Sequence, residues 1–257
     1  MHNLDKGKII TLNIFVIALF IYFCFFTNNL SKPAAVLIFI LTILFFLYQD
    51  ILKRMFLNCS KLLFRKCNTK DAKELLSKIE KIDVLGLYRK NCFILKCAII
   101  LDDFSEEAFT NFMNDNKKSK LLRNPYCNLT FSITLLQYFF LTNSREQYHS
   151  LYKKTVTSKA SQAALTDYYK KLLSILNSAF DKPDQKQLKH LHHLKQEAHT
   201  KRDEIYINLY SGYICNSLLN QKAEAEHFIK KAQQISDTFV LSSDFQTTFC
   251  AAGSYER

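Results

Sequence analysis

Four histidines crowd one short segment, and this makes them the clearest candidates for chemistry. They are His190, His192, His193 and His199. His190 and His193 are three positions apart, a spacing that places two imidazoles on one face of a helix, where they could share a metal ion. The surrounding sequence lacks an H-E-x-x-H motif, and Glu197 is its nearest acid at ligand spacing. The leucines of the segment form the apolar stripe at every third position, Leu188, Leu191 and Leu194. We therefore expect the histidines to face solvent, and we predict no metal site.

The cysteines are the second candidates, and they are scattered along the whole chain. The eight are Cys24, Cys59, Cys67, Cys92, Cys97, Cys127, Cys215 and Cys250. Cys92 and Cys97 form a C-x4-C pair, but no second pair completes a zinc site. Disulfide frameworks are typical of small secreted domains, whereas this chain has 257 residues. We expect reduced thiols that pack in the core.

Two acidic pairs, Asp102-Asp103 and Asp203-Glu204, complete the inventory. Both pairs lie at the termini of predicted helices, where acidic residues commonly act as caps and, at a helix start, complement the macrodipole. No Ser, Cys or His lies in an arrangement that pairs a nucleophile with a base. We predict that the protein is not an enzyme and that it binds no cofactor.

The charge of the chain is strongly basic, with 35 Lys and Arg against 23 Asp and Glu, a net charge of +12. The excess is concentrated in residues 53–70 and in a second cluster, Lys117, Lys118, Lys120 and Arg123. A nucleic-acid site would interleave such cations with aromatic residues along one stripe. No such stripe is present, so we expect no nucleic-acid partner.

The elements that carry these residues begin with two apolar runs, residues 9–31 and 34–49, which contain no Asp, Glu, Lys, Arg or His. Each run is close to the roughly 20 residues that a helix needs to cross a ~30 Å hydrocarbon core. We predict a two-helix transmembrane anchor over residues 1–50, with spans at about 9–28 and 33–50. Functional sites inside membranes normally contain ionisable residues. Their absence predicts an anchor rather than a transporter or an intramembrane protease.

Basic residues near the ends of the two runs predict the orientation of the anchor. The loop between the runs has only Lys32, whereas Lys6 and Lys8 precede the first run and many cations follow the second. We therefore expect a multi-pass protein of the cell membrane with both termini in the cytoplasm. The first run is longer than a signal-peptide core and lacks an A-x-A site, so we expect it to be retained.

A basic amphipathic helix is predicted over residues 51–70, directly after the anchor. Its apolar stripe is Leu52, Met55, Phe56, Cys59, Leu62 and Leu63. Its basic residues are the candidate membrane-surface residues, Lys53, Arg54, Lys61, Arg65 and Lys66. In one interpretation this helix lies on anionic lipid. In the other its apolar face packs on the next helix, and the basic face is the ordinary positive-inside signal.

Residues 71–257 are predicted to form a cytoplasmic domain of repeated helical pairs. The pairs cover residues 87–100 with a helix to about 116, 129–141 with 145–155, 163–180 with 185–199, and 205–219 with a helix after 222. Equivalent points fall near residues 108, 147, 186 and 225, a period of about 39 residues. Gly (4) and Pro (3) are scarce, which favours long helices. The predicted fold class is all-α.

The last of these pairs, best within residues 205–237, resembles the tetratricopeptide repeat (TPR) superfamily. Ala225, Ile229 and Ala232 match the small-large-small positions of the second helix of that repeat, and Gly212 lies near the glycine of its first helix. Ala108 and Phe112 match the same second-helix positions upstream, and the other units share the architecture. The resemblance implies a TPR-like α-solenoid whose concave face holds an extended peptide or a partner helix. The alternative is an irregular helical bundle without a groove.

These observations predict a membrane-anchored helical adaptor or scaffold that binds a protein or peptide partner at the cytoplasmic face of the membrane. The sequence does not identify the partner-binding groove. Two alternatives stay open: a small bacterial membrane immunity or stress-protection factor, and an accessory subunit of a membrane transporter or enzyme. The abundance of Lys, Ile, Asn and Phe is typical of an AT-rich bacterial genome.

Overall fold

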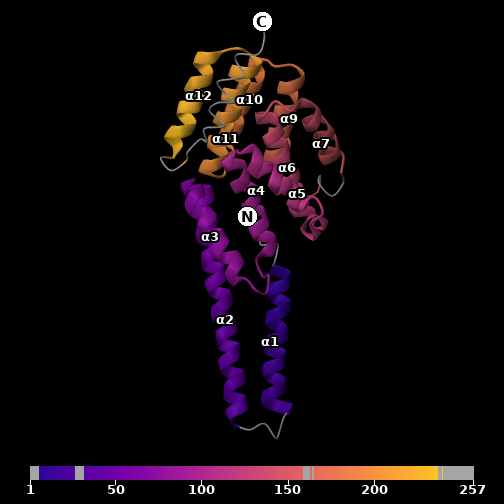
Figure 1. Ribbon diagram of the computed structural model, residues 1–257, viewed down its shortest axis with the longest axis vertical. Coiled ribbons are helices and arrows are strands. Elements are labelled where there is room, and N and C mark those ends of the chain that lie inside the picture. Colours follow the sequence, from indigo (N-terminus) through magenta and orange to yellow (C-terminus); the bar gives the residue numbers. More distant parts are fainter. Residues whose placement is uncertain (1–5, 27–31, 159–162, 164, 237–238, 240–257) are drawn as a thin grey trace.

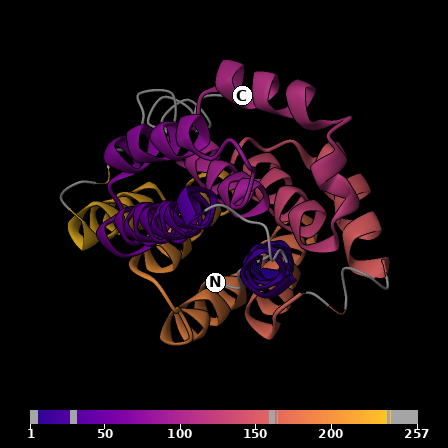
Figure 2. The same ribbon diagram turned by 90° about the horizontal axis from the view of Figure 1, so that it is seen from below.

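The computed structural model describes residues 6–26, 32–158, 163, 165–236 and 239, and within these residues the chain is helical and has no strand. Two helices, α1 (Lys6–Phe26) and α2 (Lys32–Lys61), form a stalk, and the remaining elements form a body at one end of it (Figure 1). Figure 2 looks at this body from the stalk end, and the body extends well beyond the two stalk helices. The prediction of an all-α fold is confirmed for the described residues.

The body follows the chain through short helices. Its elements are η1 (Leu62–Lys66, a π-helical turn), α3 (Thr69–Ile82), α4 (Arg89–Asp103), α5 (Glu106–Asn116), η2 (Lys120–Arg123, a 3-10 turn), α6 (Pro125–Leu141), α7 (Arg145–Thr157), α9 (Asp167–Asp181), α10 (Gln185–Gln196), α11 (Lys201–Tyr213), η3 (Ile214–Leu218, a π-helical turn) and α12 (Lys222–Ile235). Four helical pairs, α4–α5, α6–α7, α9–α10 and α11–α12, coincide with the four pairs expected from the sequence.

One helix is long and apolar enough to cross a membrane, by length and composition, and this is the helix that covers Val36–Lys66. Most of the large apolar side chains of its first part, from Val36 to Leu47, are exposed. The apolar stretch of α1, Ile9–Phe23, is shorter. The two helices are joined by a polar contact, in which the Gln49 amide donates a hydrogen bond of 2.6 Å to the Asn13 side-chain oxygen.

No break separates the apolar part of α2 from the basic helix expected after residue 50. The same helix continues into the body, where Leu52, Phe56, Cys59 and Leu63 are buried. These residues share a hydrophobic cluster with α3 and α4. The apolar face of the basic helix therefore packs against protein, as in the second of the two interpretations, while its basic residues and Leu57 remain exposed.

Side-chain caps explain why several helices begin where they do. Asn124 accepts hydrogen bonds from the backbone N–H groups of Tyr126 and Cys127, with Pro125 in the first turn of α6. Capping boxes start α10 at Asp184 and α11 at Thr200. At the start of α7 the Ser144 side chain makes no cap hydrogen bond, and its hydroxyl lies 3.0 Å from the Thr142 hydroxyl.

The row of helical pairs closes on itself through α11. The last pair packs back onto the start of the body, because α11 contacts η1. Phe140 of α6 also meets Tyr213 of α11, with ring centroids 5.0 Å apart. Within the last pair, the position of a Cβ at Gly212 would lie 3.3 Å from the Ala225 carbonyl oxygen, so glycine allows α11 and α12 to approach closely.

Candidate functional site

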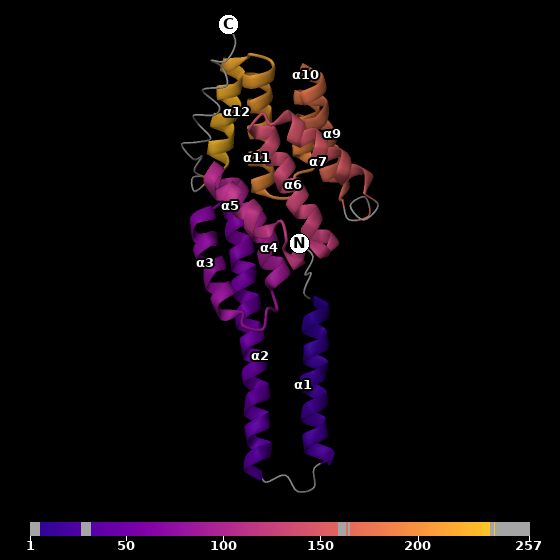
Figure 3. The same ribbon diagram turned by 45° about the vertical axis from the view of Figure 1, so that its right-hand side comes forward.

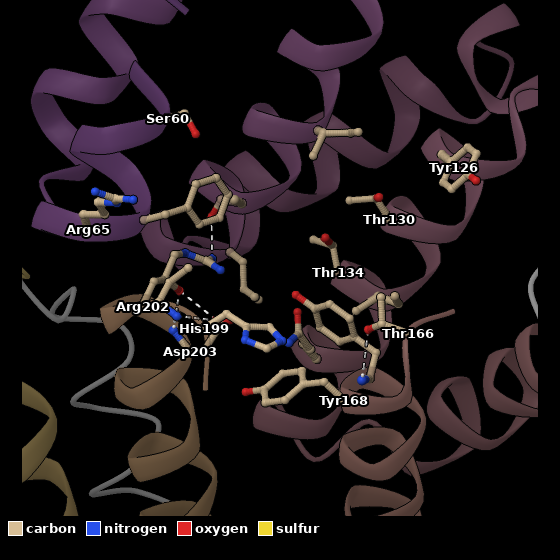
Figure 4. A pocket seen from close by; sticks show the side chains of 18 of the residues that line it. Ser60, Arg65, Tyr126, Thr130, Thr134, Thr166, Tyr168, His199, Arg202 and Asp203 are labelled. Atoms are coloured by element: carbon tan, nitrogen blue, oxygen red, sulfur yellow. Dashed lines mark hydrogen bonds between the residues drawn. The ribbon is translucent and has the colours of Figure 1, made fainter. Parts of the chain in front are cut away.

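A cavity of about 780 Å³ lies inside the closed row, next to the end of α2 (Figure 4). Its walls come from α2 and η1 on one side and from α4, α6, α9 and α11 on the others. The last four are the first helices of the four helical pairs. The cavity thus lies on the side of the row formed by these first helices, and the end of α2 covers it. Its volume falls in the range of about 300–1,000 Å³ that is typical of ligand pockets.

The walls of the cavity differ in chemistry. The apolar lining on α2, η1 and α4 consists of Leu57, Phe64, Ile94, Ala98 and Leu101. The hydroxyl lining on α6 and around the start of α9 consists of Tyr126, Thr130, Thr134, Thr166, Tyr168 and Tyr169. Lys61 and Arg65 add two exposed cations on the α2 side. This combination suits a ligand that has both apolar groups and hydrogen-bonding or anionic groups.

A buried ion pair between Arg202 and Asp102 forms part of the wall. The Arg202 Nη2 and Nε atoms donate to Asp102 Oδ1 at 2.7 and 3.1 Å, and Nη2 also donates to the Ala98 carbonyl at 2.9 Å. Both side chains are buried. Because the two residues are 100 positions apart in the chain, the pair joins α4 to α11 and holds the row closed.

Two hydroxyl groups complete the environment of Asp102. The Tyr206 hydroxyl donates to its Oδ1 at 2.6 Å, and the Thr69 hydroxyl donates to its Oδ2 at 2.9 Å. Burial, and then the Asp102 charge, raise the pKa of Tyr206 well above its usual value. Burial by itself would lower the pKa of Arg202, but the Asp102 carboxylate outweighs it and raises that pKa. The guanidinium is therefore protonated, and its charge is paired with the Asp102 carboxylate. Its role is structural, and it does not offer a free cation to a ligand.

The expectation that Asp102 caps a helix is therefore wrong, because its carboxylate is used by Arg202, Tyr206 and Thr69. The expectation for the second acidic pair is confirmed at Asp203, whose carboxylate accepts the backbone N–H of Thr200 at 3.0 Å as part of a capping box.

The groups nearest to acid–base chemistry in the cavity are His199 and the two tyrosines of α9. His199 is exposed, and its ring centroid lies 6.0 Å from that of Tyr168. Burial, and then the Asp203 charge, raise the pKa of Tyr169 to about 12, and burial raises that of Tyr168 as well. Both phenols are therefore protonated at neutral pH and can donate hydrogen bonds to a ligand.

Comparison of the chain with protein-family models, curated proteins and solved structures finds no match.

The structure divides the five predicted membrane-surface residues into two groups. Lys61 and Arg65 line the cavity, whereas Lys53, Arg54 and Lys66 lie on the surface outside it. The Arg54 guanidinium forms an ion pair of 2.7 Å with Asp50, one helical turn closer to the apolar part of α2. The basic residues thus fall into two places: Lys61 and Arg65 lie at the cavity of the body, and Arg54 lies toward the stalk.

The hydroxyl wall and Arg202 were not predicted as site residues. One sequence signal was available for the wall, because Thr130, Thr134 and Gln137 follow a helical spacing within the mainly apolar helix 125–141. No comparable signal marked Arg202, since its partner lies 100 residues away.

Of the four candidate histidines, His199 alone lines this cavity, and neither Cys92 nor Cys97 does. His190 and His193 line a separate hollow of about 340 Å³, beside the ion pair of Lys171 with Glu197. Cys92 and Cys97 belong to different hydrophobic clusters on the two sides of α4. Among the described residues, no three His, Cys, Asp or Glu side chains gather in a way that could hold a metal ion.

The described cysteines are buried thiols: Cys59, Cys67, Cys92, Cys97, Cys127 and Cys215. Burial raises the pKa of Cys67 to about 11 and that of Cys215 to about 12. Their thiolate forms are scarce at neutral pH, which agrees with the expectation of core thiols. Cys250 lies outside the described residues.

Proposed function

We propose that this protein is a membrane-anchored helical adaptor. In this proposal α1 and α2 insert as a two-pass anchor with both termini in the cytoplasm, and the TPR-like row of helical pairs receives a segment of a partner protein in the cavity. The apolar, exposed first part of α2 and the cations that follow it support the anchor. The concave position of the cavity supports the binding role.

The observation that carries the proposal is the origin of the cavity walls. Four of its walls are the first helices of successive helical pairs. In stacked helical repeats, the first helices line the concave surface that binds a partner. The hydroxyl groups of α6 and α9 can bond to the backbone of an extended peptide. Lys61 and Arg65 favour a peptide that carries carboxylate groups, and the wall of Phe64 and Leu101 favours one apolar side chain.

The continuity of α2 determines how such a partner would be presented. Lys61 follows Asp50 by eleven residues of unbroken helix, which corresponds to about 16 Å along the axis. The cavity is thus held at a fixed distance from the apolar part of α2. An adaptor with this construction binds its partner at one height above the bilayer, and not on a flexible tether.

Photo-crosslinking of the full chain in intact membranes tests the binding role. A photoreactive amino acid at Thr166, an exposed residue of the cavity, is expected to form an adduct with one protein partner. The same amino acid at Gln233, which is exposed on α12 outside the cavity, serves as the control. The Arg65→Glu change is expected to remove the adduct at Thr166, because it reverses a charge at the cavity.

Identical adducts at both positions, or an adduct at Thr166 that survives Arg65→Glu, would contradict the proposal. Resistance of the protein to extraction from membranes by alkaline carbonate is measured in parallel. That measurement reports the anchor alone, so a failure of the anchor is distinguished from a failure of partner binding.

A further inference from the structure

The turn between α3 and α4 presents large apolar side chains at its surface. We call residues 82–86 the α3–α4 turn. Val84 is 87% exposed, Leu85 is 47% exposed and Ile82 is 41% exposed. These three neighbouring residues form an exposed apolar patch on the body, and such patches mark interaction surfaces.

The position of the α3–α4 turn is determined by a contact with α2. The Tyr48 hydroxyl donates a hydrogen bond of 3.1 Å to the Ile82 carbonyl. In the views of Figures 1 and 3 the turn is the lowest part of α3 and α4, beside α2 and toward the stalk. Tyr48 lies at the end of the charge-free run of α2, just before Asp50. Tyrosine is enriched where a membrane helix meets the headgroup layer, so the tip of the turn lies at the height of that layer.

The backbone of the turn is preformed, and its polar groups are largely satisfied within the turn. Gly86 adopts a φ of 61°, which permits the reversal of the chain. The Asp83 carboxylate accepts the backbone N–H groups of Leu87 and Tyr88 at 2.7 and 2.8 Å, and the Val84 N–H donates to the Ile82 carbonyl at 2.8 Å. A segment that moves from water into a membrane interface needs hydrogen-bond acceptors for its N–H groups within the protein.

The residues that flank the turn suit the same environment. Lys81 and Arg89 are exposed on its two sides, where they can meet the phosphate groups of anionic lipids. We propose that the α3–α4 turn inserts Val84 and Leu85 into the headgroup–hydrocarbon boundary of the bilayer that α2 crosses. This inference rests on the anchor of the proposed function, but it does not depend on a partner protein. It gives the body a second membrane contact, beside the stalk.

Depth measurements on spin-labelled full-length protein test the inference. The protein is reconstituted in vesicles of phosphatidylethanolamine and phosphatidylglycerol, after Cys24→Ser and Cys250→Ser, because the other six cysteines are buried. Single labels are placed by Val84→Cys in the turn, Leu41→Cys in the apolar part of α2 and Glu74→Cys on α3. Glu74 is exposed and lies eight residues before Ile82, about 12 Å higher along α3.

The expected result is that the label at residue 84 relaxes with oxygen in preference to a water-soluble nickel complex, as the label at residue 41 does. The label at residue 74 shows the opposite preference. If residue 84 behaves like residue 74 while residue 41 stays in lipid, the inference is wrong and the anchor stands. If residue 84 is shielded from both reagents, protein covers the turn and the inference is also wrong. If residue 41 is in water, the anchor of the proposed function fails.

Discussion

The two halves of α2 differ in apolar content and in surroundings: eleven of residues 36–47 are apolar, against seven of residues 52–63. In the stalk half, residues 36–47, the large apolar side chains are mostly exposed. In the core half, residues 52–63 with the start of η1, the apolar side chains form a stripe that is buried against α3 and α4. The stalk half is apolar on all sides, whereas the core half alternates its stripe with Lys53, Arg54 and Lys61.

This difference shows that the arrangement of apolar residues around a helix indicates which of its sides are covered. A helix that is apolar all round has to be covered by lipid or by protein on every side, and a helix with one stripe is covered on that side only. Because both patterns occur in one unbroken helix, the body is coupled to the stalk without a linker.

The largest expected effect concerns the ion pair between Arg202 and Asp102, which joins α11 to α4, a helix that packs on the core half. Asp102→Ala leaves Arg202 buried without its carboxylate, and breaking a buried pair in this way costs about 3–5 kcal/mol of unfolding free energy. Asp103→Ala is the matched control, because this neighbouring carboxylate pairs with the exposed Lys73 at 2.6 Å and should contribute about 0–1 kcal/mol. Chemical denaturation of the full chain in detergent, followed by circular dichroism, measures both. Equal losses for the two variants would contradict the assignment of the Arg202–Asp102 pair.

The second prediction compares the two halves of α2 directly. Leu63→Ala in the core half should lower the unfolding free energy of the body by about 2–5 kcal/mol, because the side chain is fully buried and the change leaves a cavity. Leu44→Ala, the same change in the stalk half, should alter it by less than about 0.5 kcal/mol, because Leu44 is exposed. The same denaturation experiment measures both variants. A large loss with Leu44→Ala would mean that the stalk half packs against protein.

Much of the helical framework could be predicted from the sequence. Helix starts depend on neighbouring residues, such as the cap at Thr200 and the proline in the first turn of α6. Such signals, and the period of about 39 residues, can be read from a single sequence. The predicted boundary after residue 50 is not a break in the helix, because charge changes there while the α-helical backbone continues. Helix propensity carries no information on which neighbour covers a stripe.

The cavity could be predicted only in part, for the same reason. Its cations Lys61 and Arg65 were visible as a basic face, and Thr130 and Thr134 recur at helical spacing. The closure that makes the cavity depends on contacts between residues 100 positions apart, such as Arg202 with Asp102. Such pairs lie outside any local window, and they bring the helices of the row together around a cavity that is partly open to solvent.

A smaller effect is expected for the polar contact within the stalk. Asn13→Leu removes the acceptor of the Gln49 amide and should weaken the association of α1 with α2 by about 0.6–2 kcal/mol. A double-mutant cycle with Gln49→Leu isolates the pairwise value. Thr11→Val is the control, because the Thr11 hydroxyl donates to the Gly7 carbonyl of its own helix. A cycle with no coupling would show that the contact does not hold the stalk together.

The smallest effect concerns the pH dependence at Cys67, which follows η1 where the core half ends. Burial, and then the Asp102 charge, raise the pKa of this thiol from 9.0 to about 11. Because the folded state favours the neutral thiol, its contribution to stability is fully present below pH 9 and is lost as the pH rises from 9 to about 11. Cys67→Ala should therefore flatten the fall of unfolding free energy over this range in a pH titration of denaturation midpoints.

Maleimide should label Cys67 slowly at pH 7 in the folded protein and readily in urea. Fast labelling of the folded protein at pH 7 would place Cys67 at the surface and would mean that the packing of the core half ends before residue 67.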